Sequence, residues 1–105
     1  SELASKTGKL YFVSTYINGN KRYKIGITTQ KIKDRLSREF FTYKVIKFIQ
    51  LPLMKCYLIE KKLIDTFSKY RDRSITPSQL DGYREVFNFP EKVVESIKLL
   101  IESNE

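Results

Sequence analysis

The sequence predicts a single small α+β domain in which a three-stranded sheet, mixed or antiparallel, is flanked by helices in the order ββαβαα. Residues 9–15 and 22–28 alternate in polarity around an Asn-Gly turn, which is typical of a β-hairpin. Later stretches repeat apolar residues at helical spacing. A length of 105 residues suits one domain with a modest core.

The predicted hairpin has two chemically different faces. Leu10 and Phe12 lie on one face of the first strand, and Asn18-Gly19-Asn20 marks the turn. In the second strand the apolar face consists of Tyr23, Ile25 and Ile27. If these apolar sets share the core, Tyr11, Lys24 and Thr28 share the opposite face. Gly26 inside a strand indicates either a bulge or a close approach by backbone or ligand.

The remaining elements follow from periodicity and from turn residues. A helix over about 30–41, with Thr28 or Thr29 as its N-cap, has the core stripe Ile32, Leu36 and Phe40. A third strand over 44–51 ends at Pro52. The next helix, about 53–70, has the stripe Leu53, Cys56, Tyr57, Leu63, Ile64 and Phe67. A loop around residues 76–82 precedes a short extended segment over 83–89. The last helix, about 91–102, begins at Pro90 and has the stripe Val93, Val94, Ile97, Leu100 and Ile101.

The composition indicates a polyanionic partner and excludes several kinds of site. Twenty Lys and Arg against twelve Asp and Glu give a net charge of +8. The charge is uneven, because residues 91–105 hold two lysines and four glutamates and are therefore mildly acidic. This favours nucleic acid, and the alternative is a basic surface that serves solubility. The absence of His excludes His-based triads and His-rich zinc sites. The single cysteine, Cys56, is interpreted as a buried inert thiol in a reducing intracellular compartment, the cytoplasm or nucleus. No apolar run reaches the ~20 residues of a membrane span, so no membrane partner is expected.

Glu60 is the most informative single residue, because it falls within an apolar helical stripe. A carboxylate against a core is costly unless it is paired or binds a cation. Glu60 therefore forms a structural salt bridge, for example with Arg35 or Arg38, lies where the stripe reaches solvent, or holds Mg²⁺ completed by water and phosphate oxygens. Arg35 is either a phosphate clamp or part of a solvated helix face. Tyr11 lies either in the core or on an exposed part of the sheet, and its hydroxyl can act on a water only with help from a nearby cation such as Lys24.

The order of these residues carries more information than any one of them. The pattern x-Leu-Tyr…Lys-Ile-Gly-x-Thr…Arg…Glu over residues 9–89 resembles the GIY-YIG nuclease superfamily, especially its phage and large-virus branch with a Lys-Ile-Gly second motif. The resemblance implies that Tyr11 positions or activates water, that Arg35 contacts the scissile phosphate and that Glu60 holds one Mg²⁺ or Mn²⁺ ion. Further motif matches are Gly26, Thr28, Glu85 and Asn88, of which Asn88 could instead cap the last helix. Lys9 replaces the first glycine of the signature, and Lys24 replaces its second tyrosine.

The leading hypothesis is therefore a divalent-metal-dependent endonuclease domain over residues 1–105 that acts on DNA, encoded by a phage or virus. Its expected catalytic residues are Tyr11, Lys24, Arg35 and Glu60. Its expected backbone contacts are Lys31, Lys33, Arg38, Lys44 and Lys47. One alternative is a catalytically inactive module of the same fold that binds DNA or RNA. Another is an interaction domain whose stripe at 93–101 docks a partner. An attached domain or partner is expected to supply specificity.

Overall fold

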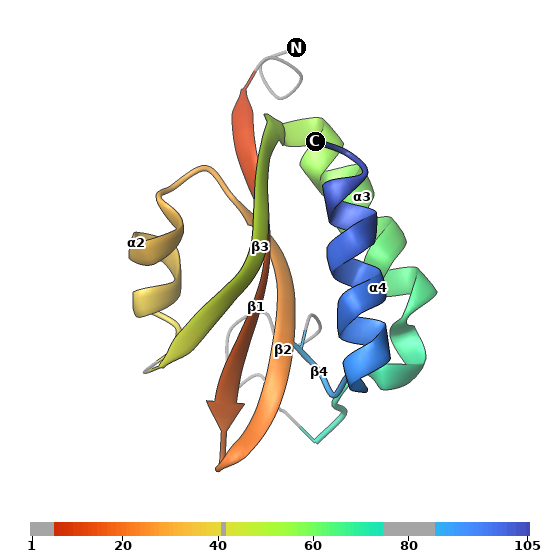
Figure 1. Ribbon diagram of the computed structural model, residues 1–105. Coiled ribbons are helices and arrows are strands. Elements are labelled where there is room, and N and C mark those ends of the chain that lie inside the picture. The colour runs from red at the N-terminus through yellow and green to blue at the C-terminus, as the bar shows by residue number, and fades with distance from the viewer. Residues whose placement is uncertain (1–5, 41, 75–85) are drawn as a thin grey trace.

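The computed structural model describes residues 6–40, 42–74 and 86–105, and it shows one antiparallel sheet with helices on both faces (Figure 1). The elements are β1 (Thr7–Ile17), β2 (Asn20–Thr28), α2 (Ile32–Ser37), β3 (Tyr43–Pro52), α3 (Leu53–Thr66), the 3-10 turn η1 (Ser68–Tyr70), β4 (Val86–Phe87) and α4 (Glu91–Glu102). The strands lie in the order β3-β1-β2-β4. The predicted α+β class is confirmed. The described sheet has four strands rather than three, because the two-residue β4 pairs with β2.

The hairpin forms where the sequence predicts it, with a tighter turn. Ile17 pairs with Asn20, so the loop contains only Asn18 and Gly19, with φ angles of 53° and 80°. Two positive φ angles define a type I′ turn, whose twist matches that of the flanking strands, and Asn-Gly is its preferred sequence. The turn sets the register that aligns β1 with β2.

Alternation along β1 and β2 divides the interior into two clusters. Leu10 and Phe12 belong to the larger cluster, which α3 and α4 cover. Tyr11 and Val13 belong to a smaller cluster with Leu36 of α2. In Figure 1, α2 lies on one side of the sheet, and α3 and α4 lie on the other. The predicted division of the hairpin faces is confirmed, and the face with polar residues is the one that α2 covers.

The helix between β2 and β3 is much shorter than predicted. Its N-cap is Lys31, so the prediction of Thr28 or Thr29 was wrong. The hydroxyl of Thr28 instead accepts a hydrogen bond of 3.0 Å from the backbone N–H of Gln30, and this bond stabilises a turn before the helix. The predicted core stripe is nevertheless correct, because Leu36 and Phe40 are buried and Ile32 packs against the same cluster.

The later helices agree with their predicted stripes except at the borders. The helix predicted over 53–70 ends at Thr66 and continues as η1. Tyr57 and Leu100 are 51% and 46% exposed, so their assignment to the core was wrong. A helix on a sheet buries a limited stripe, and residues at its edge reach solvent.

The bounds of α4 are those predicted, and its four buried residues are Val93, Val94, Ile97 and Ile101. All four pack in the larger cluster. The stripe at 93–101 is therefore occupied by the domain's own core, and the interpretation of it as a docking surface was wrong. Within 6–40, 42–74 and 86–105, no helix has both the length and the apolar character needed to cross a bilayer.

Candidate functional site

Tyr11 and Gly26 form the centre of the face that α2 covers. The two residues are direct cross-strand partners, and Tyr11 is 1% exposed. A Cβ atom on residue 26 would lie only 2.5 Å from Cζ of Tyr11, so the tyrosine ring occupies the space that a side chain would fill. The β1–β2 register is continuous here, and the irregularity lies instead between Phe12 and Val13 in the β1–β3 pairing. The bulge interpretation of Gly26 was wrong, and the group that approaches it closely is Tyr11.

Beside this pair, one buried carboxylate joins two cations. Glu39 forms an ion pair through Oε1 with Nζ of Lys24 and through Oε2 with Arg35 at 2.9 Å. The side chains of Lys24 and Glu39 are only 2% and 3% exposed. The contact with Arg35 is an ion pair rather than an aligned hydrogen bond. We call Lys24, Arg35 and Glu39 the bridged cluster.

The geometry of the bridged cluster leaves Arg35 available to an anion. A guanidinium carries five N–H donors, and Glu39 approaches only one of its nitrogen atoms, Nη1. The side chain of Arg35 is 31% exposed, whereas both of its neighbours are buried. A buried carboxylate that pairs with one nitrogen of a guanidinium limits the rotamer freedom of the arginine. The N–H groups on the solvent side of the guanidinium can then bind a phosphate. The pairing of Glu39 with Arg35 follows from their spacing of four residues along the chain, whereas the contact of Glu39 with Lys24 depends on the fold.

Glu60 lies on α3, and its height along the sheet depends on how α3 runs relative to β2. The start of α3 borders β2, because Leu53, Met54 and Tyr57 line a pocket with Ile27. The end of α3 lies near Tyr23, because Phe67 contacts Phe89 and Phe89 contacts Tyr23. The helix therefore runs antiparallel to β2.

The rise along the two elements then sets the height of Glu60. With a rise of about 1.5 Å per helical residue and about 3.3 Å per strand residue, Glu60 lies near the level of Ile25 and Gly26. Among the described residues, β4 pairs with β2 only at Tyr23 and Lys24, so no described strand covers this part of the β2 edge. Glu60 is partly buried on α3, which covers the face of the sheet opposite to the one that carries Tyr11 and α2.

The donor set limits how a metal ion would be held. The described part of the chain contains no group of three or more His, Cys, Asp and Glu side chains placed to ligate one ion. A single carboxylate remains compatible with Mg²⁺, which usually keeps several waters and takes further oxygens from substrate phosphates. The residues present therefore fit a hydrated ion held by Glu60 better than an enclosed metal site.

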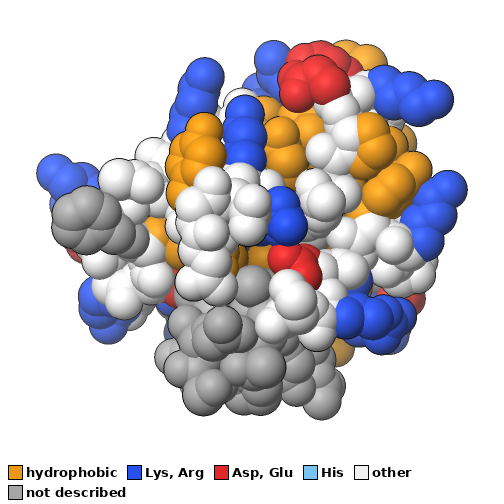
Figure 2. Space-filling view, turned by 90° about the horizontal axis from the view of Figure 1, so that it is seen from below, with side chains coloured by type: hydrophobic (Ala, Val, Ile, Leu, Met, Phe, Trp, Pro, Cys, Tyr) orange, Lys and Arg blue, Asp and Glu red, His pale blue; other side chains and the backbone are white. Residues whose placement is uncertain are grey.

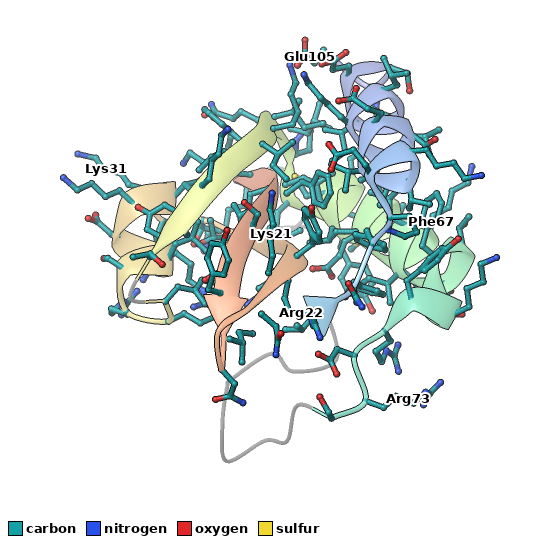
Figure 3. All side chains as sticks on the ribbon, turned by 60° about the horizontal axis from the view of Figure 1, so that its bottom comes forward. Lys21, Arg22, Lys31, Phe67, Arg73 and Glu105 are labelled. Atoms are coloured by element: carbon teal, nitrogen blue, oxygen red, sulfur yellow. The ribbon has the colours of Figure 1, made fainter. Side chains whose placement is uncertain are left out.

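The predicted backbone contacts do not form one group. Lys31, Lys33, Arg38 and Lys44 are exposed, and Figure 3 shows Lys31 extending away from the sheet. Lys47 differs, because Glu105 lies 2.5 Å from its ammonium group and raises its pKa. On the face that Figure 2 shows, Lys and Arg side chains are spread out rather than gathered in one patch.

The structure gives no sign of a functional role for the other residues that the sequence analysis named and that it describes. Asn88 is exposed and does not cap α4, whose N-cap is Pro90 without a side-chain bond. Thr28 is buried on its turn. Glu85 lies outside the described residues. Cys56 is buried, and this burial raises the pKa of its thiol, which fits the prediction of an inert side chain.

The described residues form a basic α+β domain in which Arg35 is paired with a buried carboxylate, and arginine is a residue type well suited to bind phosphate. Comparison with protein families shows that the T5orf172 domain matches residues 8–102. The chain belongs to the T5orf172 domain family, a phage-associated family of nuclease-like or DNA-binding type. No curated protein and no solved structure matches the chain.

Proposed function

We propose that this domain is a GIY-YIG-type endonuclease that hydrolyses DNA phosphodiester bonds with the help of a divalent metal ion. The observation that carries the proposal is the shared position of Tyr11, Lys24 and Arg35 on one face of the sheet, around Gly26. Tyr11, Gly26 and Arg35 match the signature pattern in order, and Lys24 stands at the position of its second tyrosine. Membership of the T5orf172 family supports a nuclease-like or DNA-binding role for the domain.

In this proposal Arg35 binds the scissile phosphate. Its outer N–H groups form charge-assisted hydrogen bonds with phosphate oxygens, and Glu39 keeps the guanidinium oriented. These donors stabilise the charge that develops on the phosphate in the transition state. Tyr11 orients the attacking water through its hydroxyl. Because Tyr11 is 1% exposed, the substrate reaches that hydroxyl only when side chains beside it move.

Glu60 is the residue proposed to hold the metal ion. When bound, Mg²⁺ or Mn²⁺ would supply Lewis-acid stabilisation of phosphate oxygens. Glu60 lies on α3, on the other side of the sheet from α2 and Arg35 and at about the height of Ile25 and Gly26. An ion held by Glu60 would therefore meet the substrate at the β2 edge.

Conversion of supercoiled plasmid to nicked or linear DNA at low salt tests the proposal. We expect cleavage in Mg²⁺ or Mn²⁺, none in EDTA, and its loss in Glu60→Gln and in Arg35→Ala. Asp65→Asn is the matched control for Glu60, because Asp65 is an exposed carboxylate on the same helix. Cleavage that persists in Glu60→Gln would contradict the metal-binding role, and cleavage in EDTA would contradict metal dependence.

The second candidate is a catalytically inactive DNA-binding module, which one observation favours. Lys24 stands at the position of the second signature tyrosine, and its ammonium group is already engaged by Glu39. A buried, neutralised lysine does not replace a phenolic hydroxyl in contact with substrate. This candidate predicts salt-sensitive retention of plasmid without nicking under any metal condition. Restoration of nicking by Lys24→Tyr would show that only the lysine prevents catalysis.

A further inference from the structure

A groove lies between β3 and α2 on the face that carries the bridged cluster. Its lining consists of four residues with large apolar side chains, Ile32, Tyr43, Val45 and Phe48, and of Lys9, Lys31 and Lys33. Its volume is about 280 Å³, just below the usual range of small-molecule pockets. We call it the β3–α2 groove. The function proposed above does not use it.

The apolar part of the groove is more exposed than the core requires. Phe48 is 50% exposed and Val45 is 36% exposed. Both lie on β3, which is an edge strand of the sheet. Single apolar residues on a surface are ordinary, but here an aromatic ring, a valine and parts of two further side chains line one continuous groove. This arrangement offers apolar side chains, including the aromatic ring of Phe48, to a planar partner.

The charged part of the groove is purely cationic. Three of its lining residues are lysines and none is acidic. Lys31 and Lys33 are exposed, and Lys9 is held in place by a hydrogen bond of 3.3 Å to the carbonyl oxygen of Gln30. A ligand that combines a planar base with negatively charged phosphates matches both parts of the groove. Aromatic rings within a basic groove are the usual means of binding unpaired nucleotides.

The groove is continuous with the candidate site. Phe48 is the direct cross-strand partner of Tyr11, and Tyr11 is the partner of Gly26, so the three residues form one row across the sheet. On the other side of the groove, the backbone N–H of Arg35 donates to the carbonyl oxygen of Lys31 at 3.0 Å. A nucleotide whose phosphate binds Arg35 would therefore have a neighbour within reach of Phe48.

We propose that the β3–α2 groove binds an unpaired nucleotide of DNA, stacking its base on Phe48 and placing its phosphates among the lysines. This inference rests on the proposed function and narrows it to DNA with a single-stranded or extruded base beside the bond that is cut. A base inside a duplex is stacked on both sides and cannot offer its face to Phe48. The groove therefore selects for local loss of base pairing.

Binding without metal tests the groove independently of catalysis. Fluorescence anisotropy in EDTA would compare a labelled single strand with a blunt duplex of the same sequence, for the parent protein and Phe48→Ala. Tyr16→Ala is the matched control, since Tyr16 is a 63% exposed aromatic residue of β1 near the hairpin turn and outside the groove. From the usual contribution of stacking, Phe48→Ala should weaken single-strand binding by about fivefold to a hundredfold. Duplex binding should not change, and Tyr16→Ala should alter neither.

A spectroscopic probe identifies the contact. A strand with 2-aminopurine at one position should lose fluorescence on binding the parent and Phe48→Trp, but not Phe48→Ala. Equal loss of single-strand and duplex binding in Phe48→Ala, or no loss of either, would overturn the proposal. So would tighter binding of RNA of the same sequence, or a concentration-dependent dimer that Phe48→Ala abolishes. Strong selective binding of single strands without plasmid nicking would refute the endonuclease while leaving the groove established.

Discussion

The substitution Glu39→Gln tests the central energetic feature of the domain, the carboxylate shared by Lys24 and Arg35. The side chain of Glu39 is 3% exposed and that of Lys24 is 2% exposed. Removing the negative charge leaves the ammonium group of Lys24 buried, with no other ionic partner among the described residues. The nearby ring of Phe40, 5.8 Å away, offers only a weak cation–π contact in its place.

The size of the effect follows from the burial of the pair. Removal of one partner from a buried ion pair costs about 3–5 kcal/mol, and the lower end applies because the amide oxygen of Gln still accepts a hydrogen bond. For a domain of this length, about 3 kcal/mol corresponds to a decrease in Tm of about 12 °C. Thermal unfolding followed by circular dichroism at neutral pH would measure this decrease.

Two further variants make the test specific. Asp65→Asn removes a carboxylate whose ion pair with Lys61 is exposed and 4.0 Å long, so it should change the free energy of unfolding by less than about 0.5 kcal/mol. The double variant Lys24→Met with Glu39→Gln also removes the buried ammonium group, so it should recover most of the stability that Glu39→Gln loses. If Glu39→Gln unfolds at the same temperature as Asp65→Asn, the argument from burial is refuted.

Three other predictions follow from single contacts. Gly26→Ala should destabilise the domain by about 1–3 kcal/mol in urea unfolding, because the new methyl group meets the ring of Tyr11. Tyr11→Leu combined with Gly26→Ala should relieve part of that loss. If the effects of the two substitutions on the free energy of unfolding are fully additive, the clash is contradicted. Burial acts to raise the pKa of Asp72, but hydrogen bonds from Ser74 and Arg22 outweigh it and lower that pKa. The stabilisation from Asp72 should therefore be present above the unfolded-state pKa of about 3.9 and disappear as pH falls through the lower folded-state value. Asp72→Asn should cost about 1 kcal/mol at pH 7 and nothing at the acid limit; an equal cost at both pH values would show that charge is not the cause. Finally, Cys56 should react with a thiol reagent at neutral pH only after urea is added, because the thiol is buried and its pKa is raised, and rapid reaction of the folded protein would contradict this.

Local patterns predicted most of the fold. Alternation assigned Leu10 and Phe12 to one face and Tyr11 and Lys24 to the other, because a strand has a side-chain period of two wherever it lies. The Asn18-Gly19 turn was readable because few residues adopt two successive positive φ angles. The ends of the helices were predicted less accurately than the strands. Gln30 and Lys31 stay outside α2 since Thr28 stabilises a turn there, and this competition has no clear signature in the sequence.

The candidate site divides in the same way between sequence and fold. The order of Tyr11, Lys24, Arg35 and Glu60 was visible in the chain, because it depends only on spacing along known elements. The catalytic roles of these residues and the binding of a metal ion by Glu60 stay predictions, which the plasmid experiment tests. The partner of Lys24 was not visible, because Glu39 lies fifteen residues away, in the turn that follows α2.

The sequence by itself determined which residues face which side of the hairpin, where the strands turn and which side chains have the types needed for phosphate chemistry. These properties depend on residue type and on periods of two or 3.6 residues, which are local. Only the tertiary structure decided that Glu39 neutralises Lys24 and anchors Arg35, that Tyr11 fills the space above Gly26, and that Phe48 lines a lysine-bordered groove beside them. The physical reason is that the partner of a buried charge and the shape of a groove depend on which distant segments the sheet brings within a few ångströms of each other.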